Sequence, residues 1–284
     1  MKKRTKILFP TDFSDPAFNA FRYALLLVDA MDADLQLIHT VYPEAEPLDL
    51  PVMVAKSSQI RVDAARESMK AFVELALAQV GSQLKNVPPI ISDIDVGTPI
   101  QSIVNRAKRE QVDLIVMGTR GERKGIEKLL GGIASGVVVH ADCPVMVVPE
   151  EVPFKQPAKI AYATGVSDSD PFEIWKATQL LEPFAPNFHC VHFNMTGKMS
   201  DDHEKMEQMK AFFEGRSPAT PIQFYHLPGK KLQDDLNHFI EEHQMDMLIM
   251  SQPKRSFLEG LFHRSQTRRM AVSCDVPLLI LKEN

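Results

Sequence analysis

Glycines gather at two points of the first half that a phosphate group could approach. Gly118 and Gly121 follow an apolar run, and Gly131 and Gly132 precede a helical pattern, giving the spacing G-x2-G-x9-G-G. Glycine has no Cβ to block close approach of an anion to backbone N–H groups. A helix start adds N–H groups without partners and the positive end of the helix dipole. The spacing therefore predicts an anion site, although turn glycines and a helix cap explain it without a ligand.

The elements that would position these glycines alternate along the chain. Short apolar runs typical of buried parallel strands are separated by amphipathic helical patterns. Polar residues follow the first run, and Ser14 or Asp15 is the expected helix N-cap, with Pro16 in the first turn. The predicted strands are 7–9, 35–38, 90–96, 114–117 and 145–148, and the predicted helices start near residues 16, 57, 99 and 133.

The pattern of the first half returns in the second. Lys6-Ile-Leu-Phe9 resembles Lys159-Ile-Ala-Tyr162, and Asp113-Leu-Ile-Val-Met117 resembles Asp246-Met-Leu-Ile-Met250. Such self-similarity indicates a duplicated domain. We predict domains at residues 1–150 and 157–284, joined by a linker from Pro149 to Pro157, with about 20 residues lost from the middle of the second copy.

Composition excludes several classes of protein. The 284 residues carry 32 Lys and Arg against 37 Asp and Glu, a net charge of −5 that argues against a nucleic-acid partner. The basic stretch from Lys254 to Arg269 is either an anion or nucleic-acid patch or a solvated helix face. The apolar run after the basic N-terminus ends at Pro10, too soon for a signal peptide, and no run is long enough for a membrane span. We expect a cytoplasmic protein with no membrane partner.

Four motifs in this order resemble the universal stress protein family. They are Phe9-Pro-Thr-Asp-Phe-Ser14, Leu37-Ile-His-Thr-Val41, Val96-Gly-Thr-Pro99, and the glycine segment that ends in Ala141-Asp-Cys-Pro-Val-Met-Val-Val148. The resemblance is strong for residues 1–150 and weaker afterwards. It implies an α/β fold of two tandem, doubly wound, Rossmann-like domains, each with a five-stranded parallel sheet.

The same resemblance implies a ligand. In the ATP-binding branch of the family, Asp12 would lie by the ribose and adenine, backbone near Thr11 and Val41 would flank the adenine, and the glycine segment would hold the phosphates. The expected adenine nucleotide is ATP or AMP, with or without Mg²⁺. The candidate binding residues are Pro10, Thr11, Asp12, Val41, Met117, Gly118, Arg120, Gly121, Gly131, Gly132, Ile133, Ala134 and Ser135.

This chain departs from the family's binding pattern in both halves. The family's ATP binders usually carry a hydroxyl residue after the third motif glycine and often another two residues later, where this chain has Gly132 and Ala134. In the second half, Gly165 stands in the place of Asp12 and Ser251 in that of Gly118. We therefore expect the second domain not to bind ATP in the family's manner, and we expect weaker binding, or a shift toward ADP or AMP, in the first.

No other chemistry stands out in the sequence. The histidine pairs His189/His192 and His238/His243 have poor spacing for a metal, and no catalytic constellation or P-loop ending is present. We expect no metal site and no enzyme beyond a weak ATPase. Phe172 and Trp175 are expected in the core. Phe212 and Phe213, on a charged helix, could cover a hydrophobic cavity.

The predicted function is therefore a stress-response protein that binds an adenine nucleotide in its first domain and acts as a sensor or regulator on an unknown protein partner. The alternatives are a nucleotide-independent scaffold or interaction protein, and a slow ATP hydrolase. Domains of this family commonly dimerise through their last strands. We therefore predict that strands 145–148 and 278–281 pair within one chain as a pseudo-twofold pair, with or without a further homodimer.

Overall fold

The computed structural model describes residues 4–43, 51–119, 131–195, 200–214, 220–252 and 275–282. The chain divides into two compact units, residues 1–154 and 155–284. No helix among the described residues is both long and apolar enough to cross a membrane. Arg120, Gly121 and the basic stretch 254–269 lie outside the described residues.

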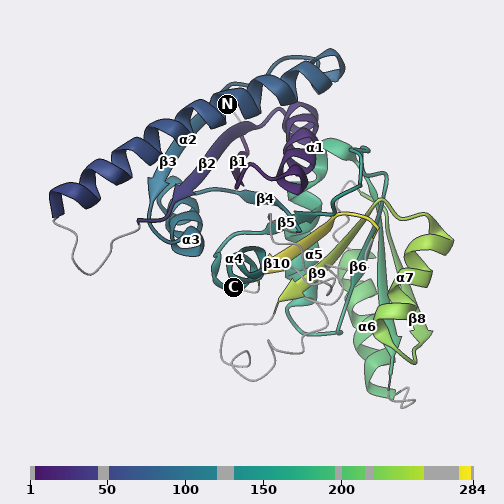
Figure 1. Ribbon diagram of the computed structural model, residues 1–284. Helices are drawn as coiled ribbons and strands as arrows, with labels where there is room; N and C mark the ends of the chain where they lie inside the picture. The colour runs from purple at the N-terminus through teal and green to yellow at the C-terminus, as the bar shows by residue number, and fades with distance from the viewer. Residues whose placement is uncertain are drawn as a thin grey trace. The chain divides into compact units, whose positions relative to one another are not determined.

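The first unit is a parallel α/β sheet with β1 at its centre (Figure 1). Its strand order is β3-β2-β1-β4-β5, and every adjacent pair is parallel. Its elements are β1 (Lys6–Pro10), α1 (Asp15–Met31), β2 (Asp34–Val41), α2 (Pro51–Val80), β3 (Ile90–Val96), α3 (Pro99–Glu110), β4 (Leu114–Gly118), α4 (Gly132–His140) and β5 (Val145–Val148). Because parallel crossovers are right-handed, α1 and α2 cover one face and α3 and α4 the other.

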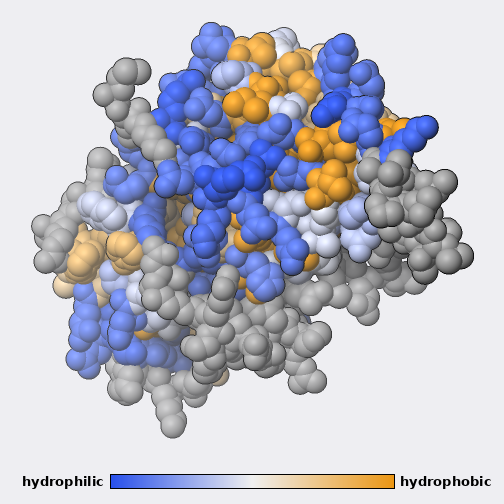
Figure 2. Space-filling model, turned by 90° about the vertical axis from the view of Figure 1, so that its left-hand side faces the viewer, coloured by the Kyte–Doolittle hydropathy of each residue, from blue (hydrophilic) through white to orange (hydrophobic). Residues whose placement is uncertain are grey.

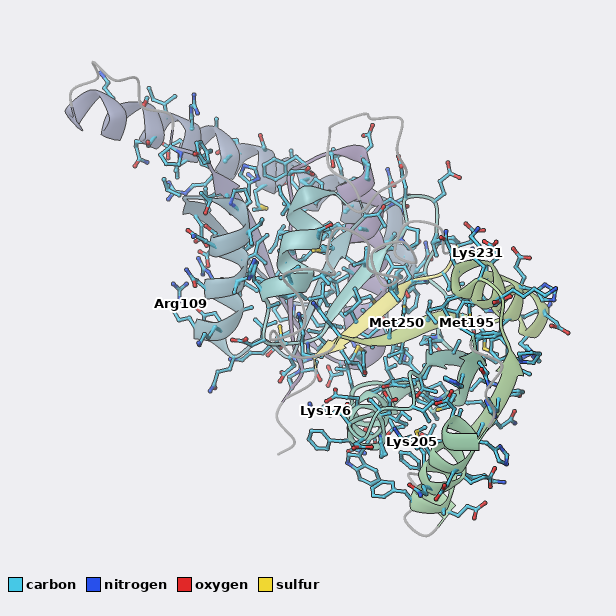
Figure 3. The ribbon with its side chains drawn as sticks, turned by 90° about the horizontal axis from the view of Figure 1, so that it is seen from below. Arg109, Lys176, Met195, Lys205, Lys231 and Met250 are labelled. Carbon is cyan, nitrogen blue, oxygen red and sulfur yellow. The ribbon has the colours of Figure 1, made fainter. Side chains whose placement is uncertain are left out.

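The second unit has the same topology among its described strands, in the order β8-β7-β6-β9-β10. Its elements are β6 (Lys159–Ala163), α5 (Asp170–Leu180), β7 (Asn187–Asn194), α6 (Ser200–Glu214), β8 (Ile222–Pro228), α7 (Leu232–His243), β9 (Met247–Gln252) and β10 (Leu278–Lys282). Figure 3 marks Lys176 on α5 and Lys205 on α6, the two helices that pack against each other. The predicted pair of doubly wound, five-stranded domains is confirmed for each unit taken by itself.

The repeat extends to single hydrogen bonds. The N–H of Lys6 donates to Asp113 Oδ2 at 2.9 Å, and the N–H of Lys159 donates to Asp246 Oδ2 at 2.9 Å. Gln111 and Gln244 end α3 and α7 in the left-handed conformation, with φ of 52° and 53°. The two copies therefore share local backbone geometry as well as strand order.

Two sequence predictions need correction in detail. Phe172 and Trp175 are not core residues, since 54% and 37% of their surfaces are exposed. The buried face of α5 is formed instead by Asp170, Glu173, Ile174 and Ala177, and Phe172 and Trp175 fall on the opposite face. The long helix begins at Pro51 rather than near Ser57, and it gives way to a 3₁₀ turn at Gly81.

The side of the molecule shown in Figure 2 is mainly hydrophilic, with hydrophobic residues gathered in separate patches. Exposed apolar side chains of the first unit include Ile60 and Leu75 on α2 and Ile91 on the edge strand β3. Scattered exposed apolar residues are ordinary for a folded domain and carry no functional argument.

Candidate functional site

The candidate site of the first unit lies where β1 and β4 end side by side. From β1 the chain continues to β2 and β3 on one side of β1, and it then crosses to β4 on the other side. The direction of strand order therefore reverses between β1 and β4. Ligands of open parallel sheets bind beyond the carboxyl ends of the strands at such a switch point. Thr11 follows β1, Gly118 ends β4, and α4 begins one residue after Gly131.

The loop after β1 holds the Asp12 carboxylate at the surface. Asp12 Oδ1 accepts hydrogen bonds from the Ser14 N–H at 3.1 Å and from Ser14 Oγ at 2.6 Å. Ser14 is the N-cap of α1, because its Oγ accepts the Ala17 N–H at 3.3 Å. Asp12 itself is exposed, and its Oδ2 makes no hydrogen bond within the described residues. The loop thus fixes one carboxylate oxygen and leaves the other available to a ligand hydroxyl.

An aromatic stack that the sequence analysis did not predict fixes the shape of this loop. Phe13 has φ of 63°, which is rare for a side chain of this size, and its ring stacks on His39 at 4.4 Å. Phe72 of α2 packs edge-on against Phe13 at 5.6 Å. His39 Nδ1 lies 2.8 Å from the Thr11 carbonyl and carries the proton of that bond, since a carbonyl oxygen only accepts. Both Phe13 and His39 lie within the quoted motifs, so the sequence marked these two residues but not their stacking.

The first turn of α4 supplies backbone donors. The Gly131 N–H donates to the Thr119 carbonyl at 2.8 Å, which ties the helix start to the end of β4. The first N–H groups of a helix have no acceptor within the helix, so those of Gly132, Ile133 and Ala134 can bind an anion. Gly132 and Ile133 are exposed, while Ala134 is buried. The backbone of this turn therefore offers N–H groups to an anion, and the anion site itself stays a prediction.

The glycines differ in what the fold requires of them. A Cβ on Gly118 would lie 3.2 Å from the Pro16 carbonyl oxygen, so this glycine is explained by the approach of α1 to β4. A Cβ on Gly132 would meet no described atom within 4 Å. Packing among the described residues therefore does not account for Gly132.

The remaining candidate residues lie at the same edge of the sheet. Pro10 ends β1, Met117 is next to the end of β4, and Val41 ends β2, where its carbonyl accepts the Gly97 N–H at 3.0 Å. Ser135 lies in the first turn of α4, and its N–H donates to the Gly131 carbonyl at 2.9 Å. Arg120 and Gly121 lie outside the described residues.

Comparison with known proteins identifies the family. Residues 3–149 match the sequence profile described as the Universal stress protein family. That match spans just over half of the chain. The chain belongs to the universal stress protein family.

Relatives agree with this assignment, and a solved structure shares the fold. The chain is 32% identical over 145 residues to a universal stress protein of Methanocaldococcus jannaschii, covering 50% of this chain and 81% of that protein. It is 28% identical over 191 residues to a universal stress protein of Mycobacterium tuberculosis, covering 65% of this chain and 61% of that protein. A crystal structure of a universal stress protein from Archaeoglobus fulgidus matches with a TM-score of 0.72 at 17% identity, over 98% of this chain and 96% of that one. The structural likeness shows the fold of both halves.

The second half of this universal stress protein keeps the framework of the site. The Thr164 N–H donates to the Val191 carbonyl at 3.0 Å, as the Thr11 N–H does to Ile38 at 2.9 Å. Val166 takes the place of Phe13 with φ of 58°, and its N–H donates to Thr164 Oγ1 at 2.8 Å. At the position of Asp12 the chain has Gly165, so the loop is retained without its carboxylate.

A buried acid occupies the interior beneath this second loop. Asp170, only 2% exposed, accepts hydrogen bonds from Tyr162 Oη at 2.9 Å and from Thr164 Oγ1 at 2.5 Å. Tyr162 Oη also lies 2.7 Å from Ser251 Oγ. Burial and the neighbouring Asp170 raise the pKa of Tyr162 well above its usual value. Since the first half has Phe9, Ala17 and Gly118 at the matching positions, the two halves present different chemistry at the same place.

Proposed function

We propose that the first half binds an adenine nucleotide, ATP or AMP, and that the protein acts as a nucleotide-dependent regulator in a stress response. One observation supports this most directly. The exposed Asp12 carboxylate and the backbone donors of α4 lie at the carboxyl ends of the adjacent strands β1 and β4. A nucleotide needs both features, because its ribose hydroxyls donate hydrogen bonds and its phosphates accept them.

The two ends of the nucleotide would use different groups. Asp12 Oδ2 would accept a hydrogen bond from a ribose hydroxyl, while Oδ1 keeps its hydrogen bonds from Ser14. The α- and β-phosphates would lie against the N–H groups of Gly132 and Ile133 at the positive end of α4. This arrangement binds and orients a nucleotide. Among the described residues it supplies no evident group to activate a water, so we propose a binding protein with at most slow hydrolysis of ATP.

A titration of the full chain tests the proposal. ATP, ADP and AMP are titrated calorimetrically, each with and without Mg²⁺, into wild type and into Gly131→Val. We expect saturable binding of one nucleotide per chain to wild type and its loss in the variant, because a β-branched side chain at the helix start blocks the phosphate. Gly165→Ala is the matched control, since a Cβ there meets no described atom within 4 Å. Equal affinity in wild type and Gly131→Val would reject the site.

A scaffold that needs no nucleotide is the second candidate, favoured by the packing of Gly118. The contact of this glycine with the Pro16 carbonyl shows that one glycine of the motif has a purely structural explanation. In that case wild type would bind none of the three nucleotides at millimolar concentration, while the protein remained folded.

A further inference from the structure

Three histidines of the second unit, distant in sequence, come together on one side of its sheet. His192 lies in β7, His226 is its register partner in β8, and His203 lies in the first turn of α6. The His192 and His226 ring centroids are 5.4 Å apart, and those of His203 and His226 are 5.7 Å apart. Asp202, next to His203, brings a carboxylate oxygen to 3.4 Å from His192 Nε2. Figure 3 labels Met195, which follows β7, and Lys231, which follows β8, and these two residues mark the carboxyl ends of the strands that carry His192 and His226.

The hydrogen bonds of His192 determine which of its nitrogens can bind a cation. Its Nδ1 lies 3.0 Å from the Thr164 carbonyl and must donate, because a carbonyl oxygen only accepts. In the neutral ring, Nε2 therefore carries a lone pair, and it points toward the Asp202 carboxylate. Two electron-rich atoms facing each other are unfavourable unless a cation lies between them, in the form of a proton or a metal ion.

Two buried nitrogens in this cluster lack hydrogen bonds. His192 Nε2 and His226 Nε2 make none within the described residues, and His192 is only 9% exposed. Buried polar atoms are normally satisfied, so such a pair calls for an explanation. An imidazole that donates through one nitrogen to a backbone carbonyl and offers the other to the cluster has the usual arrangement of a metal-ligating histidine.

The first unit shows that the cluster is not required by the fold. His39 makes the same bond to Thr11 that His192 makes to Thr164, but its ring stacks on Phe13 and its register partner in β3 is Ile94. In the second unit Val166 replaces Phe13 and His226 replaces Ile94. The second copy has thus exchanged an aromatic and aliphatic environment for imidazoles.

A pocket provides a route to the cluster. A cavity of about 460 Å³ lies between α6 and β8, and both His203 and His226 line it, together with Met206 and Phe213. Of the two phenylalanines expected to cover a hydrophobic cavity, Phe213 lines this pocket and Phe212 is not among its lining residues. The lining also includes the charged Glu207 and Lys210. An ion can therefore reach the histidines from solvent.

We propose that His192, His203, His226 and Asp202 form a binding site for a divalent transition-metal ion such as Zn²⁺. Imidazole and carboxylate ligands suit this class of ion, whereas Mg²⁺ prefers oxygen ligands alone. With the side chains in their present positions, no group of three or more His, Cys, Asp or Glu among the described residues is placed to hold a metal ion. Zn–N bonds of about 2.1 Å in tetrahedral geometry bring two ligand atoms to about 3.4 Å. The Asp202 oxygen already lies 3.4 Å from His192 Nε2, so the imidazole rings of His203 and His226 are the groups that must rotate inward.

Zinc titration of the full chain tests the proposal, by equilibrium dialysis with metal analysis in excess Mg²⁺. We expect one tightly bound Zn²⁺ per chain, and an affinity at least about 10-fold lower in each of His203→Ala and His226→Ala. Neither substitution removes the His192–Thr164 bond, so the loop stays in place. His238→Ala is the control, since that imidazole is exposed on α7 and its loss should leave the affinity unchanged.

A second measurement distinguishes a specific Zn²⁺ site from nonspecific binding of Zn²⁺ to the protein surface. Zn²⁺ should raise the thermal unfolding midpoint of wild type and not that of His226→Ala, because a ligand stabilises only the folded state that binds it. The absence of saturable Zn²⁺ binding, or equal affinity in wild type and His226→Ala, would overturn the proposal.

Discussion

Asp12 and Gly165 occupy the same place after the first strand of each half, and they show how one position can decide function. The loop around them keeps the same backbone hydrogen bonds in both copies, and a left-handed residue follows each, Phe13 in the first and Val166 in the second. Only Asp12 offers a carboxylate to a ligand. In the second half, the buried Asp170 adds a negative charge beneath the loop, which disfavours a phosphate nearby.

A single hydroxyl tests the phosphate end of the site. Gly132→Ser restores the side-chain donor that the family's ATP binders usually carry, and a Cβ there meets no described atom within 4 Å. A hydrogen bond to a charged group is worth about 1.5–3 kcal/mol, so affinity for ATP should rise by about 10- to 150-fold. Calorimetric titration of wild type and Gly132→Ser measures this gain.

The matched control for that gain is Gly165→Ser in the second half, which should leave the ATP affinity unchanged. Weaker ATP binding in Gly132→Ser than in wild type would mean that the first turn of α4 does not face the phosphates.

At the scale of elements, the carboxylate of Asp246, just before β9, accepts hydrogen bonds from the start of β6. Asp246 Oδ2 accepts the N–H groups of Ala158 and Lys159, each at 2.9 Å, and Oδ1 pairs with Lys155 at 2.5 Å. Burial alone would raise the pKa of Asp246, but the bonds from Lys155 and from the two backbone N–H groups outweigh it, and the pKa is lowered.

Asp246→Asn should therefore destabilise the second half at neutral pH, by about 1–3 kcal/mol. Because the folded state lowers the pKa of Asp246, the stability it contributes is present above the unfolded pKa of about 3.9 and is lost as pH falls through the folded value. Urea unfolding of wild type and variant from pH 7 down to pH 3 should show the two curves converging below about pH 4.

The exposed Asp234 on α7 provides the control, since Asp234→Asn removes only a surface pair with Lys231 and should change stability little. A constant difference between wild type and Asp246→Asn across the whole pH range would contradict the account of Asp246.

Elements with clear boundaries could be predicted from sequence. The bounds predicted for β3 and β5 match the structure, since Pro89 precedes one, Pro144 the other, and turn residues follow both. The start of α2 was missed because its first turns lack a periodic apolar face. The burial of Phe172 and Trp175 was predicted wrongly, because acidic residues of α5 form part of its buried face. The histidine cluster combines β7, α6 and β8, so no spacing along the chain reveals it.

At the scale of the whole molecule, duplication has left two units with one topology and different chemistry. The first half keeps an exposed carboxylate and open helix donors, while the second carries a buried acid and clustered imidazoles.

The pairing of the two halves remains a prediction, based on the apolar last strands of each. If 145–148 and 278–281 lie antiparallel and adjacent, Val147→Cys combined with Leu279→Cys should form an intrachain disulfide in a background with Cys143, Cys190 and Cys274 replaced. Cutting the linker between residues 149 and 157 would then leave the halves covalently joined until a reductant is added.

Val147→Cys combined with Ile60→Cys, whose side chain lies on the exposed surface of α2, is the control and should not crosslink. Disulfides formed only between chains would place the paired strands in a homodimer instead.

The most direct test of the central claim is a map of backbone amide shifts in the isotope-labelled full chain during titration with ATP and AMP. The account predicts saturable shifts at residues 11–14, 117–119 and 131–135, with those at 163–167 of the second half unchanged. It also predicts that Asp12→Ala weakens the response while the spectrum stays that of a folded protein. An absence of shifts at millimolar nucleotide, or shifts confined to the second half, would contradict it.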